Sequence, residues 1–502
     1  MSRSRPGLTF AILALSVGSF ATLQSLVVPV LPVIQSDLGT TTAGATWTMT
    51  AWLISAAVAT PLLGRVGDMV GKRRILILAL AAVAIGSVIA AFSPTIGSLI
   101  GARIIQGLGG AMFPLAFGIA RDELPSNRLA SAIGALASII AIGSGIGTVL
   151  AGPLADVLGW RGLFLVPVVF TVTGAILARI FIPESRTRAP GGINPWSAVL
   201  LSSWLVALLL PLSTGNQWGW GSPGVIGLFV LAVLLLAAWV IVELRSHSPL
   251  VDMRMMRLPA VWSMNAAAVF VGAAMFAVFA FFPRFVQTPT ASGYGLGASV
   301  SESGLLLLPM LVTMAVTGFA SGPLSRWLGF RSQIVYAAAV MGLSSISMAL
   351  FHATLVQVTV AAGVFGIGLG LVYAAITSVV VQSVPPTQTG IATGMNANLR
   401  TIGSAIGAAL MTAMVTGATE PSGLPAESGY TEGFLTAGLL AFGAVIVTGV
   451  AMLIARPRRT SAAEEIVTTP ESPFAESEVA LELEPTRAEE PTRDRALEPA
   501  LR

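Results

Sequence analysis

Few residue types in this chain could do covalent or metal chemistry. The 502 residues include no cysteine, only two histidines (His247 and His352) and a single lysine, Lys72. Disulfides, thiolate metal sites and thiol nucleophiles are therefore excluded. A nucleotide-binding P-loop needs a Gly-Lys-Ser/Thr sequence, whereas Arg73 follows Lys72. We therefore expect no ATP-binding site of this kind to drive uphill work. Uphill work would have to draw on an ion gradient or a partner ATPase, and we expect no cofactor, metal or enzyme activity.

Polar residues inside long apolar runs suggest another kind of chemistry, the binding and passage of a solute. An arginine in such a run costs roughly 2.5–3.5 kcal/mol to insert into a bilayer and must face protein or water. Arg103 and Arg400 both stand in such runs, and several amides share this setting. The residues predicted to line a polar path are Gln24, Arg103, Gln106, Asn265, Gln287, Asn396, Asn398 and Arg400.

Acidic residues avoid the centres of the apolar runs, so the residue that would carry a proton is not obvious. A coupled carrier needs a group whose protonation changes with access side, usually a carboxylate with a pKa shifted by burial. Asp37, Asp156, Glu243 and Glu302 all fall at or near the ends of runs. Asp156 and Glu302 are best placed for the outer half of a cavity, and they are our candidate proton-coupling sites. The alternative for both is a solvated carboxylate at a helix end.

The apolar runs are the elements that must position these residues. Hydrophobic residues make up 55% of the chain, charged residues 10%, and the mean hydropathy is +0.84, whereas soluble proteins are about 25% charged. Because backbone in lipid must satisfy its own hydrogen bonds, each run is predicted to be a helix of about 20 residues. The fourteen predicted spans are residues 8–33, 45–63, 75–92, 97–120, 130–158, 161–182, 196–214, 223–244, 260–283, 303–321, 332–351, 355–382, 391–417 and 432–455.

Basic residues orient these spans. With both termini in the cytoplasm, the cytoplasmic segments carry nineteen lysines and arginines and the external segments only Arg161 and Arg284. This bias follows the positive-inside rule and supports an even number of spans. The N-terminal run is too long for a signal-peptide core and is read as a retained first helix. Residues 460–502 hold eleven acids and four arginines, which predicts a disordered acidic cytoplasmic tail.

One loop carries a distinctive pattern of glycines and charges. Between the second and third spans the chain reads Gly64-Arg-Val-Gly-Asp68-Met-Val-Gly71-Lys72-Arg73-Arg74, and a weaker copy, Gly322-Pro-Leu-Ser-Arg326-Trp-Leu-Gly329-Phe-Arg331, follows 258 residues later. This spacing resembles the signature loop of the major facilitator superfamily. Two copies in corresponding loops imply two repeated halves. The resemblance implies a gating role for Gly64, Asp68, Gly71, Lys72, Arg73, Arg326 and Arg331, with Asp68 holding the halves closed on the cytoplasmic side.

Further motifs resemble the exporters of this superfamily. Arg103-Ile-Ile-Gln106-Gly107 is similar to its Arg-x-x-Gln-Gly element. Gly143, Gly145, Gly147 and Gly152-Pro153 resemble the antiporter motif, although the family's Gly-Pro-x-x-Gly-Gly ends here in Asp156-Val157. Small residues of this kind let helices approach closely, so plain packing is the alternative. The stretches Gly159-Trp160-Arg161 and Gly394–Gly403 resemble those of fourteen-helix drug:proton antiporters.

The resemblance implies an all-α integral membrane protein with the major facilitator fold. We expect an N-terminal six-helix half (1–182), two inserted helices with a linker (183–255) and a C-terminal six-helix half (256–459), followed by the tail (460–502). The implied function is export of small amphiphilic, drug-like compounds by proton antiport and alternating access, in the plasma membrane and as a monomer. With no central acid, neutral, zwitterionic or anionic amphiphiles are favoured as substrates.

Two other readings stay open. Within transport, the chain could be a facilitator-type importer of a nutrient or an exporter of one metabolite; importers generally line their cavities with more polar and charged groups. Outside transport, a membrane receptor or scaffold would not need arginines within spans or paired loops in both halves. The basic balance reflects membrane orientation and anionic lipid, and no nucleic-acid partner is expected.

Overall fold

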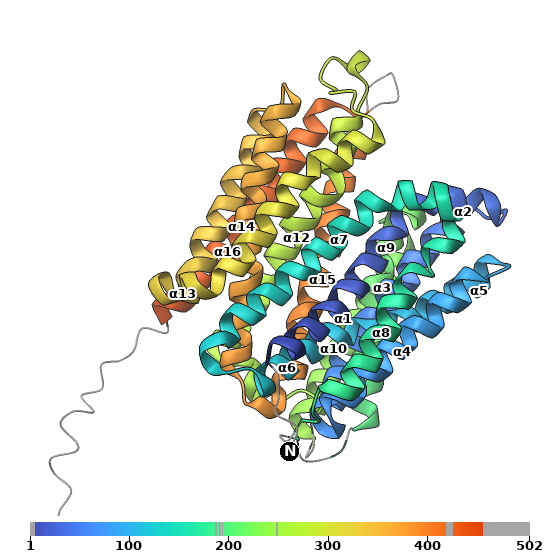
Figure 1. Ribbon diagram of the computed structural model, residues 1–502. Coiled ribbons are helices and arrows are strands. Elements are labelled where there is room, and N and C mark those ends of the chain that lie inside the picture. Colours follow the sequence, from blue (N-terminus) through green and yellow to red (C-terminus); the bar gives the residue numbers. More distant parts are fainter. Residues whose placement is uncertain are drawn as a thin grey trace, which may run out of the picture. The chain divides into compact units, whose positions relative to one another are not determined.

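The computed structural model describes residues 6–185, 188–189, 192, 194–246, 249–417 and 425–454. The predicted acidic tail and His247 lie outside this range. Most of the described chain is helical (Figure 1). The helices are α1 (Pro6–Leu26), α2 (Leu31–Asp37), α3 (Thr42–Val70), α4 (Lys72–Ala91), α5 (Ile96–Gly107), α6 (Met112–Glu123), α7 (Ser126–Leu163), α8 (Val166–Phe181), α9 (Pro195–Trp218), α10 (Pro223–Arg245), α11 (Met253–Met256), α12 (Pro259–Gln287), α13 (Val300–Leu350), α14 (Leu355–Ser383), α15 (Thr389–Gly417) and α16 (Glu427–Ile454).

Most of these helices are membrane-spanning by length and composition. Within the described residues, 11 helices are long and apolar enough to cross a bilayer, or up to 12 if a bent pair counts as one span. That pair is Leu150–Leu163 with Val166–Phe181, bent by 63°. The 49-residue stretch Glu302–Leu350 counts once although it is two helices that meet at Gly329, and α15, with its polar residues, is not among the 11. The count of fourteen therefore stays a prediction.

Two glycines make the bends in the longest helices. Gly159 in α7 has φ 67° and ψ 167°, and Gly329 in α13 has φ 63° and ψ 153°. Residues with a Cβ rarely adopt such positive φ values, whereas glycine does so at little cost in energy. Gly159 begins the turn predicted between the fifth and sixth spans, and Gly329 lies in the second copy of the loop motif. Both turns are therefore encoded by single residues.

Buried hydrophobic residues fall into two clusters. One is built mainly from α1–α8 and includes Phe20 and Phe164, both 1% exposed. The other is built mainly from α9–α16 and includes Phe282 and Phe365, both fully buried. Helices α9 and α10 join the second cluster through residues such as Trp204. Residues up to Ile454 nevertheless form one compact unit, and the division into two halves with an inserted pair remains a prediction.

Two helix pairs make the most extensive contacts between the first cluster and the second. Helix α3 packs against α15, and α7, which runs beside α1, packs against α13 (Figure 1). In the first pair a Cβ added at Gly64 would lie 2.8 Å from the carbonyl oxygen of Gly390. In the second pair a Cβ added at Gly322 would lie 2.5 Å from the Cα of Ser131. Gly64 and Gly322 occupy the same place in the two copies of the loop motif, so the repeated sequence makes a repeated contact.

Candidate functional site

The candidate site is built where the ends of α3 and α4 meet the start of α15. Gly64 and Gly390 approach so closely that a Cβ added at Gly390 would lie 2.6 Å from the carbonyl oxygen of Gly64. The same Cβ would lie 2.9 Å from Oδ2 of Asp68. Only glycine fits at such a backbone contact. The contact brings the Asp68 side chain, one helical turn after Gly64, onto the first turn of α15.

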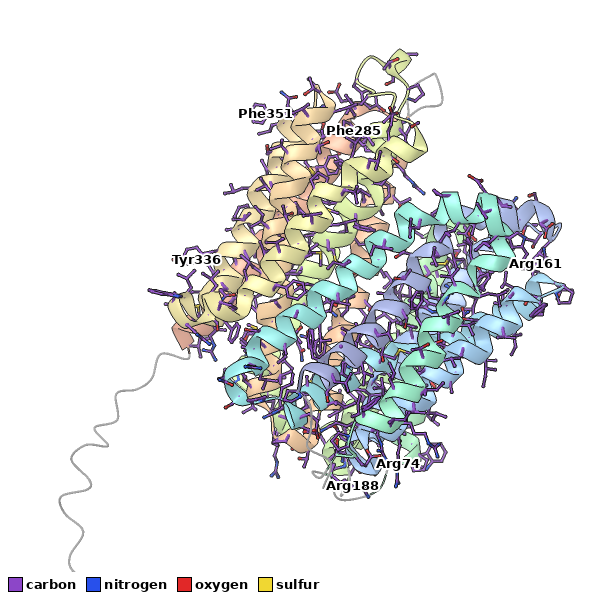
Figure 2. All side chains as sticks on the ribbon, in the orientation of Figure 1. Arg74, Arg161, Arg188, Phe285, Tyr336 and Phe351 are labelled. Atoms are coloured by element: carbon purple, nitrogen blue, oxygen red, sulfur yellow. The ribbon has the colours of Figure 1, made fainter. Side chains whose placement is uncertain are left out.

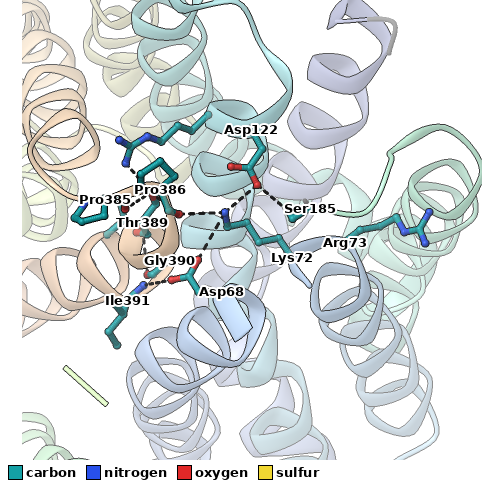
Figure 3. A network of polar contacts seen from close by, with 12 residues as sticks. Asp68, Lys72, Arg73, Asp122, Ser185, Pro385, Pro386, Thr389, Gly390 and Ile391 are labelled. Atoms are coloured by element: carbon teal, nitrogen blue, oxygen red, sulfur yellow. Dashed lines mark hydrogen bonds and ion pairs between the residues drawn. The ribbon is translucent and has the colours of Figure 1, made fainter. Parts of the chain in front are cut away.

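Asp68 caps this first turn from a distant part of the chain, 323 residues away. Its side chain is fully buried, and its Oδ2 accepts a hydrogen bond from the backbone N–H of Ile391 at 3.1 Å. The first N–H groups of a helix lack partners within the helix, and the helix dipole gives its N-terminus a partial positive charge. A carboxylate at this position is therefore stabilised both by the hydrogen bond, drawn as a dashed line in Figure 3, and by the helix dipole.

Lys72 extends the network on the other side of Asp68. Its ammonium, also fully buried, lies 3.8 Å from Oδ1 of Asp68 and donates to Oδ2 of Asp122 at 2.9 Å. It also donates to the backbone carbonyl of Pro386, just before α15, at 3.4 Å. Asp122 in turn accepts from Oγ of Ser185 at 2.8 Å (Figure 3). One lysine is thus shared between two carboxylates, and this pairing offsets part of the cost of burying these charges.

Two more hydrogen bonds join the same segments. Arg121 at the end of α6 donates through Nη1 to Oγ1 of Thr389 at 2.8 Å. Deeper in the protein, Nδ2 of Asn398 donates to the carbonyl of Ala57 at 2.7 Å, and this amide is 2% exposed. Together with the Asp68 and Lys72 contacts, these bonds hold α3, α4 and α6 against α15. We call Asp68, Lys72, Arg121, Asp122 and their α15 partners the clasp.

The remaining basic residues of the loop motif stand apart from the clasp. Arg73 and Arg74 both pair with Glu184, at 3.5 and 3.4 Å from Nε to Oε2. Gly71, with φ 132°, sits so close to Glu184 that a Cβ would lie 2.4 Å from Oε1. In the second copy, Arg326 stands where the first has Asp68; among the described residues, neither Arg326 nor Arg331 has an ion pair. The charged clasp is thus present in only one of the two copies.

Two residues predicted to line a polar path are buried inside the first cluster. Arg103 has no exposed surface and donates to Oε1 of Gln106 at 2.8 Å and to the carbonyl of Thr48 at 3.3 Å. Its guanidinium lies 5.3 Å from the ring centre of Trp52. Gln106, also fully buried, donates to Oγ of Ser87 at 2.9 Å. These two side chains therefore cross-link α3, α4 and α5.

The polar residues of α15 contact α12 and α14. Asn396 donates through Nδ2 to Oδ1 of Asn265 at 3.0 Å and to the carbonyl of Met264 at 3.2 Å, and both asparagines are buried. Arg400 is half-buried, and its guanidinium lies 4.0 Å from the ring centre of Tyr373 on α14. An arginine over an aromatic face gains a cation–π attraction without needing a carboxylate.

The last two predicted path residues lie apart from these groups. Gln24 is a half-buried residue of α1. Gln287, the last residue of α12, donates to Oγ of Ser303 at 3.0 Å. The structure therefore brings together Asn265 with Asn396, and Arg103 with Gln106, but not the predicted path residues as one group.

The antiporter-motif residues divide between packing and exposure. A Cβ added at Gly147 would lie 2.5 Å from the carbonyl oxygen of Thr22, so this glycine lets α7 approach α1. A Cβ added at Gly152 would meet no atom within 4 Å, and both Gly152 and Pro153 are exposed. The motif thus begins as a close helix contact and ends on an open surface.

The two candidate coupling carboxylates are both exposed. Asp156 lies in α7 beyond Pro153. Glu302 accepts from the backbone N–H of Ser299 at 2.8 Å and forms a capping box at the start of α13. Glu302 therefore acts as a helix cap, and neither Glu302 nor Asp156 is buried. Their coupling role stays a prediction.

Another acid near a helix end forms a clear ion pair. Asp37, at the end of α2, pairs with Arg161 and accepts from Nε1 of Trp160 at 2.9 Å. These hydrogen bonds, that of Arg161 foremost, lower the pKa of Asp37 below its usual 3.8. Arg161 also donates to the carbonyl of Ser93, just beyond α4, at 3.4 Å. The pair lies at the opposite end of the helices from Arg74 (Figure 2).

Sequence reasoning missed several residues of the clasp. Asp122 and Thr389 were not singled out, nor was Tyr373 beneath Arg400. An acid beside a basic residue at the end of the fourth span was a usable signal for Asp122, because a buried lysine needs a counter-charge. Thr389 and the Ile391 N–H carry no such signal, since the contact depends on how distant segments pack.

Comparison with known proteins gives a consistent result. The profile of the Major Facilitator Superfamily matches residues 13–408. The chain is 27% identical to the multidrug transporter protein MdtP of Bacillus subtilis (strain 168), over 79% of this chain and 73% of that protein. It is 29% identical to the cephamycin export protein CmcT of Amycolatopsis lactamdurans, over 91% and 94% of the two chains. The crystal structure of the human organic anion transporter MFSD10 is similar in fold, with a TM-score of 0.65, 16% identity and coverage of 88% of this chain and 99% of that one.

Proposed function

The chain belongs to the Major Facilitator Superfamily, and we propose that this membrane transporter exports small amphiphilic compounds by proton antiport. Membership makes it a multi-pass protein of the plasma membrane and a transporter, not an enzyme. The direction of transport is supported by the relative named as a cephamycin export protein, and the breadth of substrates by the relative named as a multidrug transporter. We further propose fourteen spans, in two six-helix halves with an inserted pair, both termini in the cytoplasm, and a functional monomer.

The observation that carries the mechanism is the clasp. Asp68 on α3 caps α15 across the boundary between the two buried clusters, with Lys72 beside it. A contact of this kind can be made in one arrangement of the halves and broken in another, which is what alternating access requires. In our proposal the clasp closes the cytoplasmic side. Substrate enters when it opens, and leaves on the other side after it has closed.

The solute path is proposed to run beside α15. Arg400 over Tyr373 presents a positive charge that no described carboxylate neutralises. The amides of Asn396, one turn before Arg400 on α15, and of Asn265 on the adjoining helix α12 add donors and acceptors. A fixed positive charge of this kind favours neutral, zwitterionic or anionic amphiphiles over lipophilic cations. Removing the charge with Arg400→Gln should therefore weaken transport of anionic substrates most.

Proton flow into the cell is proposed to reset the carrier. Asp156 and Glu302 remain the carboxylates to test, as Asp156→Asn and Glu302→Gln. A coupling residue should, when neutralised, abolish transport driven by the proton gradient while leaving gradient-independent exchange of substrate intact. A helix cap such as Glu302 should, when neutralised, lower stability without this selective loss.

Efflux of a panel of fluorescent amphiphiles from cells expressing the protein tests the proposal. We expect extrusion that a protonophore abolishes and that Asp68→Asn strongly reduces. Asp252→Asn is the matched control, because Asp252 also caps a helix, α11, but through the backbone N–H of Arg254, only two residues along the chain. If the protein is folded and in the membrane but extrudes none of the compounds, the proposal that it exports a broad range of substrates is contradicted. That result would favour an importer or an exporter of one metabolite.

A further inference from the structure

A pocket lined by arginines lies outside the clasp, where α4 begins and α8 ends. Its volume is about 410 Å³, and it is lined by Arg73, Arg74, Ile77 and Arg179. Arg74 and Arg179 are exposed, and Arg73 is half-buried. Three guanidinium groups around one pocket form a site for an anion, because each offers several N–H donors in a planar fork that suits phosphate oxygens.

The charges of this pocket are only partly neutralised by the protein. Glu184 pairs with Arg73 and Arg74 through Nε at 3.5 and 3.4 Å, distances too long for strong hydrogen bonds. Arg73 also donates through Nη1 to the carbonyl of Ile182 at 3.0 Å, which fixes it against the end of α8. Within the described part of the chain, Arg179 has no ion pair. Three arginines against one glutamate leave two positive charges without a partner.

The surface next to the pocket is apolar. Leu78 on α4 is 56% exposed, and Ile176 and Ile180 on α8 are 54% and 64% exposed. Both helices are long and apolar enough to lie in a bilayer, the second as part of the bent pair. A ligand seated among the arginines would therefore have hydrocarbon-lined surface directly beside it. A soluble anion would gain nothing from that surface, whereas a molecule with acyl chains would cover it.

We propose that the pocket between α4 and α8 binds an anionic phospholipid, with its headgroup phosphate among Arg73, Arg74 and Arg179 and its acyl chains along Leu78, Ile176 and Ile180. This end of the helices is on the predicted cytoplasmic side, where the leaflet carries anionic lipid that attracts basic residues. Glu184 stands between the headgroup and the α3–α4 turn, because it also accepts from the backbone N–H of Arg73 at 3.2 Å. A bound phosphate thus contacts the same arginines that anchor the turn following Asp68.

Native mass spectrometry of the detergent-solubilised full chain tests this site. The protein is titrated with dioleoyl phosphatidylglycerol and, for comparison, with dioleoyl phosphatidylcholine, which has the same acyl chains and no net charge. We expect phosphatidylglycerol to bind more tightly. The double variant Arg74→Gln/Arg179→Gln should weaken its binding by about fivefold for each arginine, about 25-fold in all. Arg74→Lys/Arg179→Lys keeps the charge and should stay within a few-fold of the original protein.

Arg254→Gln/Arg257→Gln is the matched control, since it removes two exposed arginines, also on the predicted cytoplasmic side, from outside the pocket. It should leave phosphatidylglycerol binding unchanged, and all variants should elute as single species in size-exclusion chromatography. Equal binding of the two lipids, or equal losses in the pocket and control variants, would overturn the proposal. Displacement of the lipid by glycerol 1-phosphate at a similar concentration would overturn it too, because the site would then belong to a soluble anion.

Discussion

Neutralising Asp68 should open the clasp. Asp68→Asn keeps an oxygen that can accept from the Ile391 N–H but removes the negative charge from the N-terminus of α15 and from the buried Lys72. Charge-assisted hydrogen bonds are about twice as strong as neutral ones, and a charge at a partly buried helix terminus contributes up to about 2 kcal/mol. Lys72 keeps Asp122 as a partner, which limits the loss. We expect the clasped arrangement to lose about 1–3 kcal/mol, a shift of roughly 5- to 150-fold in the equilibrium.

Double electron–electron resonance can measure this shift, because the chain has no cysteine of its own. Spin labels on Asn127→Cys and Gln382→Cys, both at exposed positions, would report the separation of α7 and α14 at the proposed cytoplasmic side. Asp68→Asn should move the distance distribution towards longer separations, and Asp252→Asn should not. Identical distributions in the original protein and in Asp68→Asn would refute the clasp as the contact that closes this side.

Three further changes have expected outcomes. Gly390→Ala should push α15 away from α3 and lengthen the same label distances, at a cost of about 1–3 kcal/mol for overpacking; unchanged distances would contradict the close contact. Glu243→Gln should lower the thermal unfolding temperature in detergent, because the buried carboxylate accepts a hydrogen bond from the Leu250 N–H at 2.9 Å and so holds the linker after α10. A hydrogen bond to a charged group contributes about 1.5–3 kcal/mol to stability. Asp37→Asn should lower the unfolding temperature near neutral pH by breaking the pair with Arg161. That pair lowers the pKa of Asp37 from 3.8. Its contribution to stability is therefore present above pH 3.8 and is lost as the pH falls through the lower pKa of the folded state. A difference in unfolding temperature between the variant and the original protein that persists below that pKa would contradict the assignment.

Much of the helical framework follows from the sequence. The predicted spans 223–244 and 355–382 correspond to α10 (Pro223–Arg245) and α14 (Leu355–Ser383) within a residue or two. Such runs are recognisable because lipid forces every backbone group into a helix, so length and apolar character are enough. The turn at Gly159 was also predictable, because glycine followed by two polar or interfacial residues interrupts an apolar run.

The site was harder to predict than the framework. Asp68 was recognisable from its loop motif, but its partner, a backbone N–H 323 residues away, has no side-chain pattern. Arg103 and Gln106 were identified as polar residues of one span, yet periodicity alone did not show that both turn towards Ser87 and Thr48 within the first cluster. For Glu302 the sequence did carry a signal, the Ser-x-x-Glu pattern of a capping box.

Transport into proteoliposomes tests the central claim, proton-driven export, most directly. The purified chain is reconstituted, and uptake of the best-extruded dye of the panel is followed with a proton gradient of either direction. The account predicts accumulation in vesicles with an acidic lumen, its collapse with a protonophore, and a strong reduction in Asp68→Asn. Accumulation that needs an acidic exterior would indicate symport, and accumulation indifferent to the gradient would indicate facilitated diffusion; either result would contradict the account.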